Sequence, residues 1–425
     1  MLPNESYKWN EVERVVQTLR HRYNLHEIKT PMFEHTELFV RGVGNSTDIV
    51  NKEMYTFTDK GGRSITLKPE GTAGVVRSFI ENSLFNEPLP LKLYYITPCF
   101  RYERPQAGRL RQHTQFGSEW FGCDSVEADA EILMLASDFY KSFGINPTVL
   151  INNLGCSECR KNYISALKEF FAPKIKDMCP DCEKRFETNP LRILDCKVEE
   201  CKQINKSAPK ISDYLCEDCK TRFEQLKTLL TKLGVNYKFD PMLVRGLDYY
   251  TNLIFEFVDE DKKLGQNALG GGGRYNNLVE ELGGKPMPVV GFGIGIERLL
   301  LYLENKGIEV KNNQVLDVYV ANATNNLEPI VKIVKLLRDN NISCEMNLSN
   351  RSLKAQFKYA DKINAKNVLV IGDDELKQKK FTIKNLSEGK QTEIGEEDLI
   401  KYFKGWNVYF WTNGIAYWQK WNRKT

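Results

Sequence analysis

The residues best suited to chemistry stand in the stretch Leu243-Val-Arg-Gly-Leu-Asp-Tyr-Tyr-Thr-Asn-Leu-Ile-Phe-Glu-Phe257. Arg245, Tyr249 and Tyr250 lie here on a short turn that leads into an alternating, strand-like segment. A guanidinium stays charged at physiological pH, and a tyrosine offers both a ring and a hydroxyl. We therefore expect the turn to hold a small polar ligand beside a pocket. The alternative is an ordinary turn before a buried strand.

A second stretch, from Pro98 to Gly122, reads as a strand, a basic loop and a second strand. Arg101 and Glu103 are two residues apart, so they share one face of the first strand. Gln115 and Glu119 share a face of the second strand in the same way. A forked guanidinium beside such a face suits a phosphate group, whereas the ordinary explanation of these arginines is a solvated basic loop.

Two glycine-rich stretches, Gly270 to Tyr275 and Gly291 to Arg298, suggest close approach of the backbone to a ligand. The second lacks the third glycine of the dinucleotide fingerprint, and the first lacks the Gly-Lys-Ser/Thr of a P-loop. We expect each stretch to place a cation, Arg274 or Arg298, next to the ligand. A tight packing corner is the alternative for both.

Eight of the eleven cysteines fall between Cys156 and Cys219 as four pairs, three of which have Cys-x-x-Cys spacing. This spacing lets two thiolates converge on one tetrahedral zinc ion, and two such pairs complete a structural site. The alternative is a helical insert with reduced thiols. The candidate ligands of a structural Zn²⁺ are Cys156, Cys159, Cys179, Cys182, Cys216 and Cys219.

The composition is that of a globular chain able to bury a large core and a smaller one. It has 425 residues, of which 41% are hydrophobic, and a net charge of +4 that is too small to argue for nucleic acid by itself. No apolar run approaches the ~20 residues that span a bilayer. The N-terminus lacks the basic and apolar regions of a signal peptide. We expect a cytoplasmic protein without a membrane partner.

The elements that must position these residues follow from periodicity. Residues 8–26 have helical spacing, 28–39 is expected to be extended, and a further helix begins near Ile296. Strands of a core sheet are expected at 63–67, 92–97, 116–121 and 148–151, and again from Leu243 onward. Residues 154–232 are charged and helical, which predicts an insertion within a core of residues 1–310.

The character of the chain changes after residue 304. A strand at 317–321, a helix at 327–340 and a strand at 367–372 predict a separate small α/β domain over 315–404. The remaining stretch, 405–425, holds four of the six tryptophans. Its Asn413-Gly414 pair between aromatic runs predicts a β-hairpin with a type I′ turn, for which sequence suggests no role.

In their order, these segments resemble the class II aminoacyl-tRNA synthetases, and among them the bacterial histidyl-tRNA synthetases, over residues 5–404. Phe100-Arg101-x-Glu103 with the following loop and Gln115-Phe-Gly-x-Glu119 resembles motif 2, and Gly291 to Arg298 resembles motif 3. The segment around Lys29-Thr-Pro31 resembles motif 1. The two histidine-specific motifs are matched by Leu243 to Tyr250 and by Gly271 to Tyr275, and the substrate-binding turn by Thr66 to Thr72.

The resemblance implies an α/β (α+β) fold with an antiparallel sheet flanked by helices, a helical insertion and a C-terminal anticodon-binding domain. It implies ATP-dependent ligation of L-histidine to the 3′ end of tRNA(His), through a histidyl-adenylate and with release of pyrophosphate. ATP would be a substrate, accompanied by Mg²⁺, and the chain would form a homodimer through motif 1. The alternatives are a catalytically silent paralogue that binds histidine as a regulatory subunit, and an RNA-binding module.

The resemblance also implies residue roles. Catalysis would rest on Arg245 and Arg101 at the α-phosphate and on Arg298 at the γ-phosphate. Histidine would be held by Glu70, Thr72, Gln115, Glu119, Tyr249, Tyr250 and Tyr275. ATP would contact Arg101, Glu103, Arg109, His113 and Arg298, and the tRNA acceptor end would contact Arg104, Gln106 and Arg111.

Two features depart from the family pattern. The chain begins at Leu2-Pro-Asn-Glu without the leading Pro-Arg-Gly-Thr of relatives, which bears on the expected dimer edge. His113 stands where the motif 2 loop often offers a phenylalanine to adenine, and an imidazole ring is expected to stack there with weaker ATP binding at most.

In the C-terminal domain, the basic stretch from Asn350 to Ala360 is expected to meet anticodon bases with one face and to pack into its own core with the other.

Overall fold

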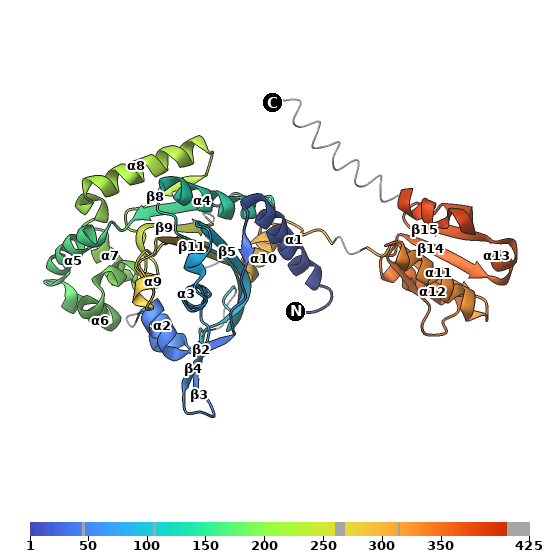
Figure 1. Cartoon of the computed structure of the whole chain (residues 1–425), viewed down its shortest axis with the longest axis horizontal. Coiled ribbons are helices and arrows are strands. Elements are labelled where there is room, and N and C mark those ends of the chain that lie inside the picture. Colours follow the sequence, from blue (N-terminus) through green and yellow to red (C-terminus); the bar gives the residue numbers. More distant parts are fainter. Residues whose placement is uncertain (45–46, 105–107, 260–267, 313–314, 406–425) are drawn as a thin grey trace. The chain divides into compact units, whose positions relative to one another are not determined.

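The computed structural model describes residues 1–44, 47–104, 108–259, 268–312 and 315–405 (Figure 1). It divides into two units, Met1–Lys311 and a second unit that begins at Asn312. The hairpin predicted around Asn413-Gly414 lies outside the described residues. Within them, no helix is both long enough and apolar enough to cross a membrane.

The first unit is built on an eight-stranded sheet (Figure 1). Its six inner strands are antiparallel, and the short strands at the two edges each pair in parallel with their neighbours. This confirms the expected sheet core. In spatial order the strands are β1 (His26–Glu27), β5 (Leu91–Phe100), β6 (Gln112–Phe121), β11 (Val289–Gly295), β10 (Ala268–Arg274), β9 (Thr251–Val258), β7 (Thr148–Asn153) and β8 (Tyr237–Phe239).

Alternation along the strands gives the sheet two different faces. Phe116 and Trp120 of β6 belong to one hydrophobic cluster, and Phe121 belongs to another on the opposite face. Helices α1 (Ser6–Tyr23), α4 (Val126–Lys141), α8 (Glu217–Lys232) and α10 (Ile296–Asn305) supply apolar side chains to the first cluster. Helices α3 (Thr72–Glu81) and α9 (Leu278–Glu281) supply them to the second. The Gln115 and Glu119 side chains therefore lie on the α3 side of the sheet.

The chain between β7 and β8 is a helical insertion with a hydrophobic cluster of its own. Besides α8, it contains α5 (Ser157–Phe171), α6 (Pro180–Thr188), α7 (Glu199–Asn205) and the short 3₁₀ helices η3 (Ile175–Asp177), η4 (Pro190–Asp195) and η5 (Ile211–Tyr214). Five of the buried residues in this cluster are cysteines: Cys159, Cys182, Cys196, Cys201 and Cys219.

Two sequence predictions about the first unit are wrong. Residues 28–39 were expected to be extended, but only β2 (Phe33–His35) is a strand, and α2 (Thr36–Val43) follows at once. Residues that are buried in α2 recur at helical spacing: Phe39, Gly42 and Val43. Because this spacing buries one face of a helix, the chain is helical here although the segment around Pro31 before it is not. The strand expected at 63–67 forms as β4 (Ser64–Leu67), but in a separate three-stranded sheet with β2 and β3 (Thr56–Thr58) and not in the core sheet.

The second unit has a five-stranded sheet. Its strands, in spatial order, are β13 (Cys344–Met346), β12 (Val318–Ala323), β14 (Asn367–Gly372), β15 (Lys380–Asn385) and β16 (Gln391–Gly395). The first three are parallel, and the last two add to them in antiparallel fashion. The second unit also contains the helices α11 (Leu327–Asp339), α12 (Leu353–Lys362) and α13 (Asp373–Gln378). This agrees with the small α/β fold predicted from the alternating pattern.

Candidate active site

A cavity of about 240 Å³ opens on the α3 side of the central sheet, against β6, β10 and β11. It brings together residues that are far apart in the sequence. The predicted site residues that line it are Glu70, Thr72, Arg101, Glu103, Arg109, His113, Gln115, Arg245, Tyr249, Tyr250, Tyr275 and Arg298. The cavity therefore has arginines, carboxylates and tyrosine hydroxyls within reach of one small ligand.

Glu70 fixes the start of α3 and at the same time faces the cavity. Its two carboxylate oxygens accept hydrogen bonds from the backbone N–H groups of Thr72 and Ala73, at 2.7 and 2.8 Å. These are among the N–H groups that a helix leaves unpaired at its first turn. Burial raises the pKa of Glu70, and the two backbone hydrogen bonds act in the opposite direction. A ligand ammonium group at this point would find a preformed, rigid carboxylate.

Glu119 lies directly behind the cavity wall and is fully buried. Its Oε1 accepts hydrogen bonds from the Thr72 hydroxyl at 2.8 Å and the Tyr95 hydroxyl at 2.9 Å. Its Oε2 accepts one from the hydroxyl of Tyr275. Burial raises the pKa of Glu119 well above the ordinary value, although the hydrogen bonds from Thr72 and Tyr95 act in the opposite direction. The carboxyl group can thus orient a ring of hydroxyls, or accept an N–H that displaces one of them.

Gly291 of β11 is required by this arrangement. It pairs with Glu119 across the β6–β11 ladder, on the same face of the sheet. A Cβ atom added at Gly291 would lie 1.8 Å from Glu119 Oε2 and 2.3 Å from the Tyr275 hydroxyl oxygen. Gly291 therefore makes room for the Glu119 side chain.

Three tyrosines form a continuous aromatic wall. The rings of Tyr249, Tyr250 and Tyr275 have centroids between 4.7 and 6.3 Å apart and meet in tilted or edge-on contacts. All three are at most 6% exposed. Aromatic rings with buried hydroxyls suit a ligand that is itself a small polar ring.

Arg245 reaches the cavity from the turn before β9. One of its Nη atoms forms an ion pair with Glu256 of β9, and its Nε is buried without a hydrogen-bond partner among the described residues. Burial by itself lowers the pKa of Arg245, but the Glu256 carboxylate together with Tyr249 and Tyr250 raises it above the ordinary value. Arg192 of η4 donates to the Arg245 backbone carbonyl at 3.1 Å. The guanidinium is thus charged and held by Glu256, while Arg192 fixes the backbone that carries it.

A second group of cations lies where β5 ends. Arg101 donates from Nε to the Pro69 carbonyl at 2.8 Å and stands 4.0 Å from Glu103, which in turn pairs with Arg109 at 3.2 Å. The sequence analysis placed Arg101 and Glu103 within the first strand. Strand β5 ends at Phe100, so both residues instead follow it. They still face the same cavity.

Arg298 is the first-turn arginine of α10. It donates to the Ala268 carbonyl at 2.5 Å, while burial and the nearby charge of Arg109 lower its pKa. Because an arginine starts from a pKa above 12, the side chain keeps its charge. Arg101, Arg245 and Arg298 therefore place three fixed positive charges around one cavity.

His113 of β6 lies against this positive group. Burial, with the charges of Arg101 and Arg298, lowers its pKa to about 3. The ring is therefore neutral at physiological pH. A neutral imidazole can stack on a planar ligand without adding to the positive charge around it.

The structure does not place every predicted residue at the cavity. Arg274 was expected beside the ligand, but it is fully buried and pairs with Asp129 of α4 at 2.5 Å. It also donates to the Cys123 and Ser125 carbonyls at 2.9 and 3.0 Å, so it ties β10 to the opposite side of the sheet. Strand alternation explains the error, because Arg274 projects away from the ligand side.

The loop residues predicted to meet RNA are only partly described. Arg104 and Arg111 are exposed, and the Arg111 guanidinium lies over the Tyr102 ring, 4.4 Å from its centroid. Gln106 lies outside the described residues. Neither Arg104 nor Arg111 is among the residues that line the cavity.

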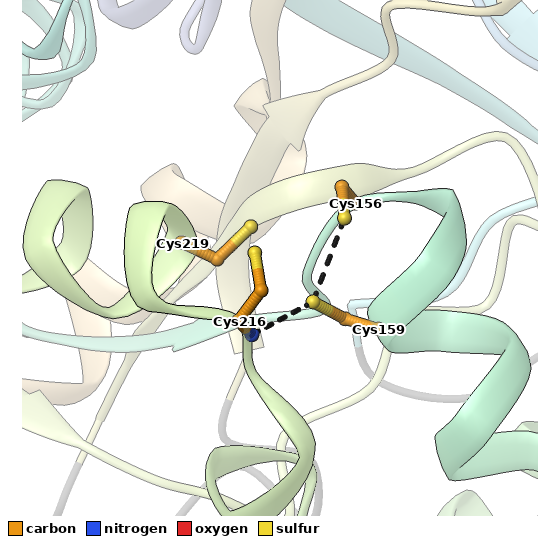
Figure 2. A group of neighbouring side chains, drawn as sticks. All are labelled: Cys156, Cys159, Cys216 and Cys219. Carbon is orange, nitrogen blue, oxygen red and sulfur yellow. Dashed lines mark hydrogen bonds between the residues drawn. The ribbon is translucent and has the colours of Figure 1, made fainter.

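The six candidate zinc ligands do not form one group. Cys156, Cys159, Cys216 and Cys219 come together at the neck of the insertion (Figure 2). Cys179 and Cys182 instead join Cys196 and Cys201, which the candidate set omitted. The irregular spacing of Cys196 and Cys201 hid them, because four residues lie between them where the other pairs have two.

Three further residues of the site were missed. Tyr95 holds Glu119, Glu256 holds Arg245, and Glu297 lines the cavity, where its carboxylate accepts the Thr114 N–H at 2.8 Å. Alternation along β9 could have revealed Glu256, since it stands between apolar residues on the same strand as the opening turn. For Tyr95 the sequence carries no signal, because a buried tyrosine in a strand is ordinary.

Comparison with known proteins agrees with this geometry. A family model described as "Histidyl-tRNA synthetase" matches residues 1–299, and one described as "Anticodon binding domain" matches residues 314–406. The chain is 52% identical to the histidine–tRNA ligase of Caldanaerobacter subterraneus subsp. tengcongensis over 406 residues, covering 95% of this chain and 97% of the relative. It is 50% identical to that of Clostridium novyi over 94% of this chain and 95% of the relative. The crystal structure of the apo histidyl-tRNA synthetase of S. aureus superposes with a TM-score of 0.80 at 41% identity, covering 95% of this chain and 97% of that one.

Proposed function

The chain belongs to the histidyl-tRNA synthetase family and charges tRNA with histidine, and we propose that the residues around the cavity divide this work as follows. The first step joins histidine to ATP, and the second passes the histidyl group to the 3′ end of tRNA(His). The regulatory-paralogue alternative is not favoured, because the near-full-length relatives are histidine–tRNA ligases. The observation that carries the proposal is the meeting of three arginines with a carboxylate-and-tyrosine wall in a single cavity.

In the first step, the histidine carboxylate attacks the α-phosphate of ATP, and pyrophosphate leaves. Two anions must approach each other, so fixed positive charge at the reacting phosphate lowers the barrier. We assign Arg245 and Arg101 to the α-phosphate and Arg298 to the γ-phosphate end. Glu103, Arg109 and His113 complete the ATP site, with the neutral His113 ring against adenine. The ion pair with Glu256 holds Arg245 in place before substrate arrives.

Histidine is selected at its two ends. Glu70, Thr72 and Gln115 hold the ammonium group, and the carboxylate of Glu70 is already fixed by the helix start. Tyr249, Tyr250 and Tyr275 enclose the imidazole ring. We infer that an imidazole N–H takes the place of the Tyr275 hydroxyl at Glu119 Oε2. An amino acid without this N–H leaves Glu119 buried and unpaired, which rejects it strongly.

Mg²⁺ would accompany ATP at this site. Magnesium takes oxygen ligands, usually one or two carboxylates together with phosphates and water. Glu103 and Glu297 both line the cavity beside Arg298, and their donor type fits the ion. Bound there, Mg²⁺ would neutralise phosphate charge alongside the arginines, while these two residues position it.

tRNA would meet the protein in both units. Arg104, Gln106 and Arg111 of the motif 2 loop are proposed to contact phosphates of the acceptor end, a contact that positions RNA without reading its sequence. In the second unit, α12 buries Gln356 and Ala360 and exposes Lys354 and Lys358. This leaves a basic face, which we propose meets anticodon bases, while the other face packs into the core.

A homodimer and a cytoplasmic location complete the proposal. Met32 and Phe33 beside motif 1 are 44% and 56% exposed, and Phe57 on β3 of the same three-stranded sheet is 48% exposed. Clustered exposed apolar side chains of this kind mark contact surfaces. Light scattering coupled to size-exclusion chromatography of the purified chain should give twice the chain mass, whereas a monomer would refute the dimer.

The residue assignments are tested by exchange of labelled pyrophosphate into ATP. Replacing Arg245 by alanine should lower the histidine-dependent rate by about 10²–10³-fold, the usual loss when one preorganised charge donor is removed. Lys232→Ala is the control, because Lys232 is exposed at the end of α8 and is not among the residues that line the cavity. Equal rates for the two variants would refute the role of Arg245.

A further inference from the structure

The eight cysteines of the insertion are arranged as two groups of four. One consists of Cys156, Cys159, Cys216 and Cys219, and its side chains face a common space between the starts of α5 and α8 (Figure 2). The other consists of Cys179, Cys182, Cys196 and Cys201. In each group all four sulfur atoms lie within 4.8 Å of one another, and all eight thiols are free. We call these groups the neck tetrad and the inner tetrad.

The sulfur spacing matches one tetrahedral ion in each tetrad. Four thiolates at ~2.3 Å from a zinc ion are about 3.8 Å from each other. The Cys156 and Cys159 sulfurs are 3.5 Å apart, and those of Cys179 and Cys196 are 3.7 Å apart. A disulfide needs ~2.05 Å. Sulfur atoms gathered in fours at this distance are therefore arranged for a metal and not for pairwise oxidation.

The local backbone favours thiolates at both tetrads. Cys156, Cys179 and Cys216 are the residues immediately before α5, α6 and α8, and their Cys-x-x-Cys partners lie in the first turns of these helices. Unpaired N–H groups and the helix dipole stabilise negative charge there. In addition, the Cys216 N–H donates to the Cys159 sulfur at 3.1 Å, and the Cys179 N–H donates to the Cys201 sulfur at 3.3 Å. The two tetrads thus share one pattern of support, in which a backbone N–H from one pair caps a sulfur of the other.

We propose that each tetrad binds one Zn²⁺, so that the chain carries two structural zinc ions. The neck tetrad joins the strand that leaves the core sheet to the helix that returns to it, across the sixty residues between Cys156 and Cys216. The insertion has only a small core of its own, much of it cysteine, and a small core gains most of its stability from such cross-links. Zinc is the ion that four thiolates in a tetrahedron select.

The tetrads also reach the histidine-specific turn. Arg160, which follows Cys159, donates to the Tyr250 carbonyl at 2.8 Å and to the Asp248 carbonyl at 3.3 Å. Arg192 lies in the sequence between Cys182 and Cys196 of the inner tetrad, and it donates to the Arg245 carbonyl at 3.1 Å. Each tetrad thereby fixes one arginine that holds the backbone of the turn. Arg160 and Arg192 are positioning residues, and this part of the inference rests on the proposed function.

Metal analysis of the purified full-length chain tests the sites directly. Elemental mass spectrometry should find about two zinc ions per chain. Cys159→Ser and Cys182→Ser should each remove about one, and Cys344→Ala, a buried cysteine of the second unit, should leave the count unchanged. A count of about one zinc or less in the unmodified chain, iron in its place, or disulfides in the tetrads would overturn the proposal. The count for the unmodified chain decides even if a variant fails to fold.

The positioning role is tested by kinetics. Arg160→Ala should raise the KM for histidine about 10-fold in the exchange assay with little change in kcat, and the zinc count should stay near two. Arg160→Lys, which keeps a donor on a long side chain, should recover part of the affinity. An unchanged KM in Arg160→Ala would overturn the positioning role. Exchange activity in a chain without zinc would refute the metal sites alone, whereas zinc without histidine-dependent exchange would refute the proposed function alone.

Discussion

Replacing Glu119 by glutamine should have opposite effects on activity and on stability. In the folded chain Glu119 is fully buried, accepts three hydroxyl hydrogen bonds, and has a pKa raised well above its ordinary value by burial. Glutamine keeps the shape and the hydrogen-bonding reach but cannot carry charge. The substitution therefore separates the electrostatic role of this side chain from its packing.

The loss of activity follows from one hydrogen bond. Glutamine offers one acceptor oxygen where the carboxyl group of Glu119 offers two, so the imidazole N–H is left without its acceptor. A buried polar group left unpaired costs about 1–3 kcal/mol, which corresponds to a loss of roughly 5- to 150-fold in kcat/KM for histidine. The loss should appear in histidine-dependent pyrophosphate exchange. The KM for ATP should stay unchanged, because Glu119 lies at the histidine end of the cavity.

The gain in stability has a definite sign. The folded chain holds the Glu119 proton to a higher pH than the unfolded chain does, so stability falls as pH rises from about 4.3, the ordinary pKa of glutamate, toward the raised value. Glutamine has no proton to lose. The variant should therefore unfold at a higher temperature than the unmodified chain, with a difference that grows with pH across this window.

Thermal unfolding followed at pH 5 and at pH 8 measures this difference. A gain of 1 kcal/mol corresponds to about 2–4 °C in a unit of this size. Glu304→Gln, on the exposed side of α10, is the control and should change neither the unfolding temperature nor the exchange rate. A Glu119→Gln chain with full histidine activity, or with a lower unfolding temperature at both pH values, would refute the reasoning.

Two further predictions concern Gly291 and His113. Gly291→Ala places a Cβ 1.8 Å from Glu119 Oε2 and should raise the KM for histidine at least about 10-fold in the exchange assay. The control is Gly395→Ala, whose Cβ meets nothing closer than 3.8 Å and which should leave the KM unchanged. Equal KM values for the two variants would contradict the role of Gly291. His113 stays neutral down to its pKa of about 3, so the KM for ATP should not change as pH passes 6.5, the ordinary pKa of histidine. A change in KM near pH 6.5 that disappears in His113→Phe would contradict the neutral state of this ring.

Much of the site could be predicted because its residues stand at fixed spacings within motifs. Gln115 and Glu119 lie two positions from Gly117 on one strand, and alternation alone puts them on one face of the sheet. The turn that carries Arg245 was likewise recognisable from its residue types. Because these local patterns agree with each other, the sequence predicted both the family and the fold.

The remaining features depend on tertiary contacts that no local pattern encodes. Arg274 has the same type and setting as Arg298, yet the strand face on which it falls directs it to Asp129. The two cysteine pairs of the neck tetrad lie more than fifty residues apart and those of the inner tetrad more than ten, so sequence could not show which pairs meet or that Cys196 and Cys201 take part. Tyr95, which holds Glu119, is set by strand register.

Histidine-dependent exchange of pyrophosphate into ATP by the unmodified chain tests the central claim most directly. Each of the twenty amino acids is supplied separately with ATP and Mg²⁺, and the label incorporated into ATP is measured. We predict exchange with histidine and, with every other amino acid, a rate lower by about 10⁴-fold or more, because each leaves the buried polar groups around Glu119 unpaired. Exchange supported equally by another amino acid, or none with histidine, would contradict the account.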